Sequence, residues 1–180
     1  DEQRIASPEF AGNSLKGKPA MVVSATISTA PTMIYFGQEL GEDGSENAGF
    51  GAPSRTSIFD YVGVPSLQRW VHDKQFDGGA SRQEELALRD FNKRLLNFTI
   101  KSDALMGVYK DIHAYNRKNT TNYTTKVLSF VRWSIDEKLV VISNFDENET
   151  YNFQLEIPSD IIKKWNLATG KYQFKDQLYN

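Results

Sequence analysis

One short stretch, PTMIYFGQELGE at residues 31–42, constrains the fold more than any other part of the chain. Its apolar run at residues 33–36 is too short for an ordinary helix and too rich in strand formers for a loop, so it predicts a strand buried on both faces. Gly37 follows at once and lets the backbone turn sharply, and Glu39 comes two residues later. Folds built from parallel strands and helices place their working residues just past the ends of buried strands. The pattern therefore predicts a functional carboxylate at a strand end.

Composition sets broad limits on what the chain can be. Its 180 residues allow one domain or two small ones, and 39% hydrophobic with 24% charged residues is typical of a globular protein. The net charge of −2 excludes a general attraction to nucleic acid or to an anionic membrane. The sequence contains no cysteine, which excludes disulfides, thiolate chemistry and cysteine-bound zinc. No apolar stretch approaches the roughly 20 residues of a membrane-spanning helix.

Two short helices are predicted around the central stretch. Residues 20–29 combine a helical stripe with β-branched side chains, so local propensity leaves helix and strand equally open. The short Ala30-Pro31 connection to the strand at residues 33–36 favours a helix, because parallel strands need a crossover element between them. Residues 65–73 predict a second helix with Trp70 turned inward, and a sugar-stacking platform is the less favoured alternative for Trp70.

The clearest helix is predicted over residues 81–102. Apolar side chains recur there at spacings of three and four, and Ser81 with Glu84 forms a capping box at the start. The polar, Gly-rich residues 42–55 show no period and predict a solvated loop, because they lack the spacing of a calcium-binding EF-hand.

The pattern changes to short strands in the second half of the chain. Four strands are predicted, at residues 126–135, 138–145, 150–157 and 171–178. In the third strand apolar and polar residues alternate, which indicates one buried face and one solvent-exposed face. Successive short strands at close to ten-residue spacing predict an antiparallel sheet or sandwich. We therefore place a domain boundary near Asp103, which divides the chain into residues 1–103 and 104–180.

Three parts of the chain together resemble the α-amylase superfamily, glycoside hydrolase family 13. The opening DEQRIAS resembles the end of that family's Asn-His-Asp region, and residues 31–41 resemble its eighth barrel strand. The all-β tail resembles its C-terminal sandwich domain. The resemblance implies an α+β chain, in which residues 1–103 are a partial (β/α)8 barrel segment (last strand and helices) and residues 104–180 an antiparallel β-sandwich domain. A complete barrel takes about 250 residues, so we expect a C-terminal fragment whose sandwich could itself be truncated.

The resemblance also implies an activity and site residues. Family members act on starch or maltooligosaccharides with retention of configuration, using a nucleophilic Asp after strand four and an acid/base Glu after strand five. Retaining enzymes hold such a pair about 5–5.5 Å apart, and neither strand is present, so the isolated chain is expected to be inactive. Asp1 matches the third carboxylate, which stabilises the transition state in the full-length enzyme. Arg4 and Glu39 are expected to bind substrate at the same rim, with a structural hydrogen bond the favoured alternative for Glu39.

Two functions of other classes stay open beside this one. A non-catalytic carbohydrate-binding module is compatible with the sandwich and its aromatic residues, although the buried strand followed by Gly-Gln-Glu speaks against it. An amylase-like scaffold that serves as an interaction protein is the other alternative. We expect an α-glucan as partner, and neither nucleic acid nor a membrane.

No metal or cofactor is expected in this chain, whereas calcium is compatible with the full-length protein. His72 and His113 lack a Ser or Asp arrangement typical of nucleophilic catalysis, so a structural or exposed place is expected for both. A strand at residues 33–36 without its barrel neighbours would present an unpaired apolar edge. We therefore expect that part of the chain to rearrange, to be poorly ordered or to self-associate.

Overall fold

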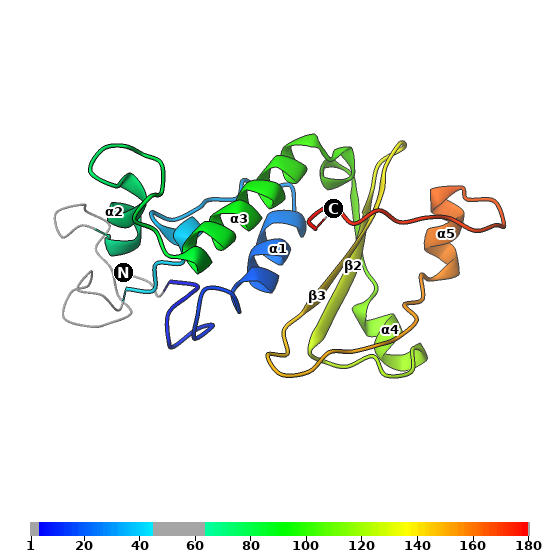
Figure 1. Ribbon diagram of the computed structural model, residues 1–180. Coiled ribbons are helices and arrows are strands. Elements are labelled where there is room, and N and C mark those ends of the chain that lie inside the picture. The colour runs from blue at the N-terminus through cyan, green and yellow to red at the C-terminus, as the bar shows by residue number, and fades with distance from the viewer. Residues whose placement is uncertain (1–3, 45–63, 180) are drawn as a thin grey trace. The chain divides into compact units, whose positions relative to one another are not determined.

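The computed structural model describes residues 4–44 and 64–179, so Asp1 and most of the loop predicted at residues 42–55 lie outside the described residues. The described chain is of the α+β class, as predicted (Figure 1). Its elements in chain order are α1 (Lys18–Thr26), the 3-10 helix η1 (Gln38–Leu40), α2 (Pro65–Val71), α3 (Gln83–Lys101), the 3-10 helix η2 (Asp103–Met106), β1 (Val108–Asp111), α4 (His113–Asn119), β2 (Val127–Trp133), β3 (Lys138–Asn144) and α5 (Ser159–Trp165). None of the helices described here is both long enough and apolar enough to span a membrane.

The chain divides into two compact units, and the domain boundary predicted near Asp103 stays a prediction. One unit contains Asp1–Lys18 and Thr32–Arg94, and the other contains Pro19–Pro31 and Leu95–Asn180. The second unit therefore combines α1 with the strands that follow in the second half of the sequence. The assignment of residues 1–103 to a barrel stays a prediction.

The three predicted helices are confirmed as α1, α2 and α3, but the cap of α3 lies one residue later than predicted. The backbone N–H of Arg82 donates to Glu85 Oε2 at 2.8 Å, which is one half of a capping box. The predicted pair was Ser81 with Glu84. Ser81 Oγ is instead buried without a hydrogen-bond partner among the described residues. Glu85 also forms an ion pair with α2, so a tertiary contact selects which of the two neighbouring glutamates forms the cap.

The strand predicted at residues 33–36 is wrong. The segment has no regular secondary structure, and its side chains Met33 and Phe36 are 81% and 42% exposed. A strand buried on both faces needs a neighbouring strand and covering helices. Among the described residues, only β1, β2 and β3 form a hydrogen-bonded sheet, and this segment is not part of it. Met33 and Phe36 consequently remain in solvent, whereas Ile34 and Tyr35 are half-buried.

The sheet of the second unit contains two of the four predicted strands. It has the order β1-β2-β3 with antiparallel neighbours, so the strands predicted at residues 126–135 and 138–145 are confirmed as β2 and β3. The register aligns Val131 with Val140. The strands predicted at residues 150–157 and 171–178 are wrong, because neither segment is assigned as a strand. One strand and two α-helices were not predicted, namely β1, α4 and α5, nor were the 3-10 helices η1 and η2.

One buried side chain explains why residues 151–157 remain outside the sheet. Asn116 of α4 is fully buried, and its Nδ2 donates to Glu156 O at 2.9 Å while Glu156 N donates to its Oδ1 at 2.8 Å. These are the two bonds that a neighbouring strand would offer to one residue. Nδ2 also donates to Ile112 O at 2.9 Å, and Thr120 Oγ donates to Oδ1 at 2.6 Å. The amide thus takes the place of a partner strand.

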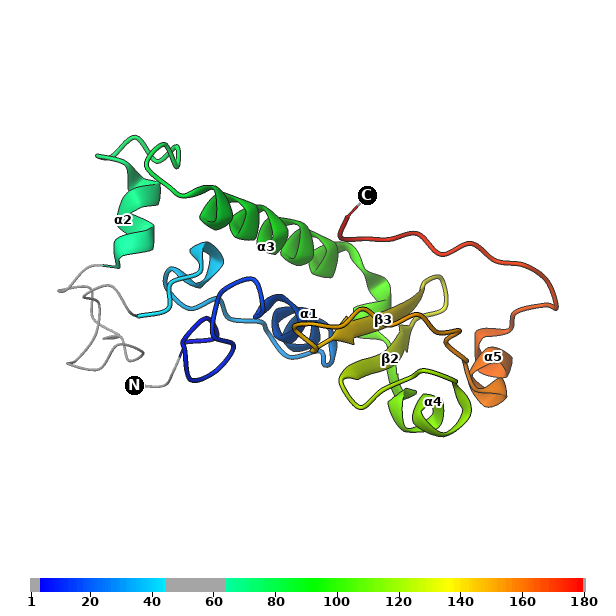
Figure 2. The same cartoon turned by 60° about the horizontal axis from the view of Figure 1, so that its bottom comes forward.

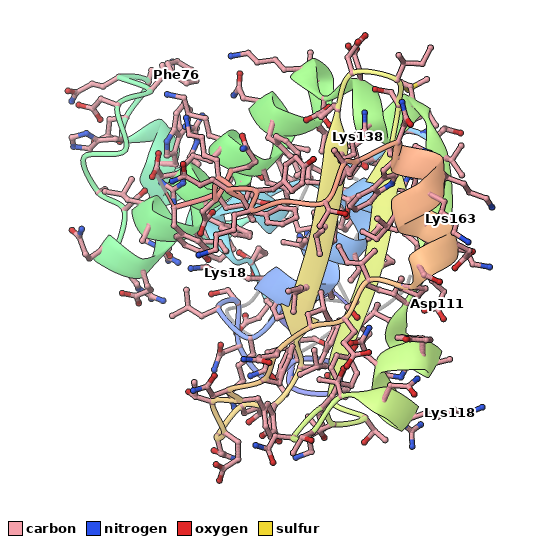
Figure 3. The ribbon with its side chains drawn as sticks, turned by 90° about the vertical axis from the view of Figure 1, so that its right-hand side faces the viewer. Lys18, Phe76, Asp111, Lys118, Lys138 and Lys163 are labelled. Atoms are coloured by element: carbon pink, nitrogen blue, oxygen red, sulfur yellow. The ribbon has the colours of Figure 1, made fainter. Side chains whose placement is uncertain are left out.

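Helices α4 and α5 lie on one side of the β2–β3 hairpin (Figure 1). The core of this layer consists of Ile112, Val131, Trp133, Ile161 and Trp165. The two tryptophan rings meet edge to face, with centroids 6.2 Å apart. On the outer side, Lys118 of α4 and Lys163 of α5 project away from the sheet (Figure 3). α5 thereby covers this sheet face with the buried side chains of Ile161 and Trp165, whereas the buried side chain of α4 is the polar Asn116.

Candidate functional site

The stretch that opened the sequence analysis ends in a tight turn between two glycines. Gly37 and Gly41 both have φ of 80°, in the left-handed region, and η1 lies between them. Gly37 O accepts hydrogen bonds from Leu40 N and from Glu42 N, each at 3.1 Å. The sharp turn predicted at Gly37 is therefore confirmed, although the strand before it is not. Residues with a side chain rarely adopt this backbone conformation.

Close neighbours also require glycine at both ends of the turn. A Cβ atom on Gly37 would lie 2.8 Å from Val64 Cγ1, and one on Gly41 would lie 2.6 Å from Ser14 Cβ. Neither distance is compatible with normal packing. The backbone therefore lies in close contact with Val64 at Gly37 and with Ser14 at Gly41. These two contacts hold the turn that carries Glu39.

Arg4 is buried beside this turn. The residue is only 4% exposed, its Nη1 donates to Phe36 O at 2.6 Å, and its guanidinium carbon lies 4.5 Å from the ring centroid of Tyr35. Burial lowers the pKa of Arg4, and the carboxylates of Glu42 and Glu39 oppose that shift. The structure thus brings Arg4 and Glu39, two of the predicted site residues, within electrostatic reach of each other.

Glu39 is half-buried on η1 and forms no hydrogen bond among the described residues. Its predicted contact with substrate stays a prediction, as does its placement on a shared rim with Asp1. Asp1, the predicted transition-state stabiliser, lies outside the described residues. Of the three predicted site residues, the structure therefore describes the positions of Arg4 and Glu39.

Sequence reasoning did not single out Glu42, the most enclosed acid of the turn. Glu42 is 4% exposed; its Oε1 accepts from Gly44 N at 2.9 Å, and its Oε2 accepts from Ser66 N at 3.2 Å and from Ser66 Oγ at 2.9 Å. Ser66 lies in the first turn of α2, so the carboxylate connects the glycine turn to that helix. The available sequence signal was the acid after Gly41 together with a Pro-Ser pair that opens a helix.

A cavity of about 230 Å³ adjoins the turn. Its wall includes Ser14, Glu42, Ser66, Arg69 and Glu85. The last two form an ion pair in which Arg69 Nε donates to Glu85 Oε1 at 3.0 Å. Neither Arg4 nor Glu39 lines the cavity, so the predicted substrate-binding residues lie outside it.

Trp70, weighed as a sugar-stacking platform, is half-buried against other side chains. The guanidinium carbon of Arg89 lies 4.5 Å from the Trp70 ring centroid. Phe76 meets the same ring edge to face at 6.3 Å. One face of the indole is therefore covered by a cation in the folded chain.

The two histidines have separate local partners. His72 Nδ1 lies 2.7 Å from Asp77 Oδ1, and the pKa of Asp77 is lowered by the backbone N–H of Gly79 and by His72. His113 Nδ1 lies 3.2 Å from the hydroxyl of Tyr123. Within residues 4–44 and 64–179, no group of three or more His, Asp or Glu side chains is placed to hold a metal ion. Each histidine thus has a local partner, Asp77 for His72 and Tyr123 for His113.

Comparison with known proteins places one segment of the chain in a family. Residues 118–174 match the family model described as alpha amylase, C-terminal all-beta domain. The match is consistent with the C-terminal region of glycoside hydrolase family 13, and it includes β2, β3 and α5. No curated protein and no solved structure matches the chain significantly.

Proposed function

Because the chain contains an alpha-amylase C-terminal all-beta domain at residues 118–174, we propose that it is the C-terminal part of an α-amylase-type glycoside hydrolase. The full-length protein would act on starch or maltooligosaccharides with retention of configuration. Residues 1–103 would supply the last strand and helices of a (β/α)8 barrel, followed by the β-sandwich domain. The 180-residue chain would itself be inactive, because the nucleophile and the acid/base belong to earlier strands. The family match is the observation that carries this proposal.

In this proposal the glycine turn and the loop before α1 form part of the sugar site. Asp1 stabilises the positively charged transition state, which requires a carboxylate held close and oriented before reaction. Arg4 and Glu39 bind substrate from the same rim. Support for a fixed site comes from the enclosed Arg4 guanidinium, bonded to Phe36 O, and from the close neighbours of the backbone at Gly37 and Gly41. Calcium, if used, would be bound elsewhere in the full-length protein.

The test compares the full-length enzyme with its variants on maltooligosaccharides. The Asp1→Asn variant should lose about 10²–10³-fold in kcat with a small change in KM, because the charge acts on the transition state. The control is Glu9→Gln, which makes the same chemical change at an exposed residue. Equal activity of the two variants would contradict the role of Asp1. Turnover by the 180-residue chain alone would contradict the expected inactivity.

A carbohydrate-binding module is the second candidate, and the exposed aromatic side chains near the C-terminus favour it. Tyr172 and Phe174 are 54% and 61% exposed and alternate with polar residues. Such rings can stack on sugars as well as on protein. Titration of the 180-residue chain with maltooligosaccharides in a calorimeter distinguishes the two, since specific micromolar binding by the chain favours the module. An amylase-like scaffold is distinguished by a full-length reading frame that lacks the catalytic Asp and Glu.

A further inference from the structure

Arg132 of β2 is a buried cation without a carboxylate partner in the described part of the chain. The residue is 1% exposed. Its Nη1 donates to Thr26 O at 3.0 Å, and its Nη2 donates to Gly107 O at 3.1 Å and to Leu105 O. Its Nε has no hydrogen-bond partner among the described residues. Its three hydrogen-bond acceptors in the described part of the chain, the carbonyls of Thr26, Leu105 and Gly107, are all backbone groups.

This arrangement makes the buried charge dependent on α1. Moving a guanidinium out of water is costly unless polar partners replace the water, and burial lowers the pKa of Arg132. Thr26 is the last residue of α1. The final carbonyls of a helix lack partners within the helix and carry its negative partial charge. The end of α1 therefore supplies an acceptor of the kind that Arg132 needs.

Helix α1 also lies beside the β2–β3 hairpin in both ribbon views (Figures 1 and 2). Its buried side chains are Met21, Ala25 and Thr26. The sheet face that carries Arg132 has three further buried residues, the register partners Phe130 and Val141 together with Ser143. Residues 19–31 accordingly belong to the same compact unit as residues 95–180.

We propose that this sheet face is a docking surface whose partner is helix α1, and that Arg132 makes α1 and the all-β domain one cooperative folding unit. The bonded residues Arg132 and Thr26 are 106 positions apart in sequence, and the family match begins only at residue 118. The segment that matches the family model therefore does not include α1, the helix whose end binds the guanidinium of Arg132. The proposal rests on the contacts within this unit and does not depend on the enzymatic activity.

Native-state hydrogen exchange of the wild-type chain, measured against denaturant, tests the proposal without a variant. Segments that open in one event share the same free energy of opening and the same denaturant dependence. The amides of α1 should open together with those of β2 and β3, and separately from those of α2. Opening of α1 together with α2, or free exchange of α1 while the sheet stays protected, would overturn the proposal.

A pair of matched variants then tests Arg132 itself. Arg132→Met keeps most of the side-chain length and removes the guanidinium, so protection factors in α1 should fall by about 100-fold or more, because several hydrogen bonds to a charged group are lost. Arg117→Met makes the same change at an exposed position of α4 and should leave α1 protected as in the wild type. Wild-type protection of α1 in Arg132→Met would overturn the role of Arg132. If Arg132→Met does not fold, the wild-type exchange pattern decides.

Discussion

Replacing Asn116 by alanine should destabilise the second unit far more than its size suggests. Asn116 is fully buried and forms four side-chain hydrogen bonds, two of them with the backbone of Glu156. The substitution removes all four. It also leaves the N–H and the C=O of Glu156 without the partner that holds residues 151–157 against α4.

The magnitude follows from the groups that lose their only partner. Ile112 O still accepts the helical bond from the backbone N of residue 116 at 3.0 Å, and Thr120 is partly exposed and can bond to water. The two backbone groups of Glu156 remain. A buried polar group left without a partner costs about 1–3 kcal/mol. Because Glu156 lies at the surface, where water reaches part of the lost sites, we expect a loss of about 2–4 kcal/mol.

Urea unfolding followed by circular dichroism measures the effect on the free energy of unfolding. The matched control is Asn119→Ala, on the same helix, where the side chain is exposed and donates one bond to Tyr115 O at 2.8 Å. We expect the control to lose no more than about 0.5 kcal/mol. Hydrogen exchange should show lost protection at residues 151–157 in Asn116→Ala alone.

Two results would refute this reasoning. Free energies of unfolding for Asn116→Ala and Asn119→Ala that agree within about 0.5 kcal/mol would mean that the buried amide does not hold the segment. A large loss of stability with unchanged exchange at residues 151–157 would mean that the amide acts only inside α4, through its bonds to Ile112 and Thr120.

Three further measurements follow from the structure. Gly41→Ala should destabilise the first unit by about 2–3 kcal/mol more than Gly12→Ala, as measured by urea unfolding, because both have positive φ but only Gly41 lacks room for a Cβ. Hydrogen bonds from Tyr151 and Lys126 lower the pKa of Asp146 from 3.8 to about 2. The carboxylate therefore stabilises the folded state fully above pH 4, and this contribution is lost as the pH falls toward 2. Asp146→Asn should abolish this acid-dependent loss of stability, as measured by unfolding at pH 2 to 5. Light scattering should detect self-association of the chain that weakens in Met33→Ser, since Met33 is 81% exposed; a strict monomer would contradict this.

The sequence predicted elements well where the pattern alone decides the structure. α3 is long and amphipathic, and β2 and β3 are joined by a short polar turn, so local preference and tertiary packing agree there. The prediction of a strand within residues 31–36 was wrong for the opposite reason. A buried strand needs a paired strand and covering helices, and the described chain does not provide them there. The alternation at residues 151–157 was real, but a side chain of α4 replaces the expected strand partner. Seven-residue helices such as α4 and α5 give too short a pattern to detect.

In the candidate site too, the features set by local sequence were predictable and those set by distant contacts were not. The turn at Gly37 was predictable, because only the backbone is involved and the residue type is diagnostic. The enclosure of Arg4 was not, since it depends on contacts with Phe36 and Tyr35 far along the chain. The role of Glu42 was hidden for the same reason, because its partner Ser66 lies 24 residues away.

The long separation between Thr26 and Arg132 has a consequence during protein synthesis. A ribosome that adds about 5–20 residues per second needs roughly 5–20 s to make the chain between them. Throughout that interval no Arg132 guanidinium is present to donate to the carbonyl of Thr26, and the apolar side of the nascent helix remains open to chaperones or to other chains. Slower translation before β2 should therefore lengthen the time in which the emerging polypeptide is prone to aggregate.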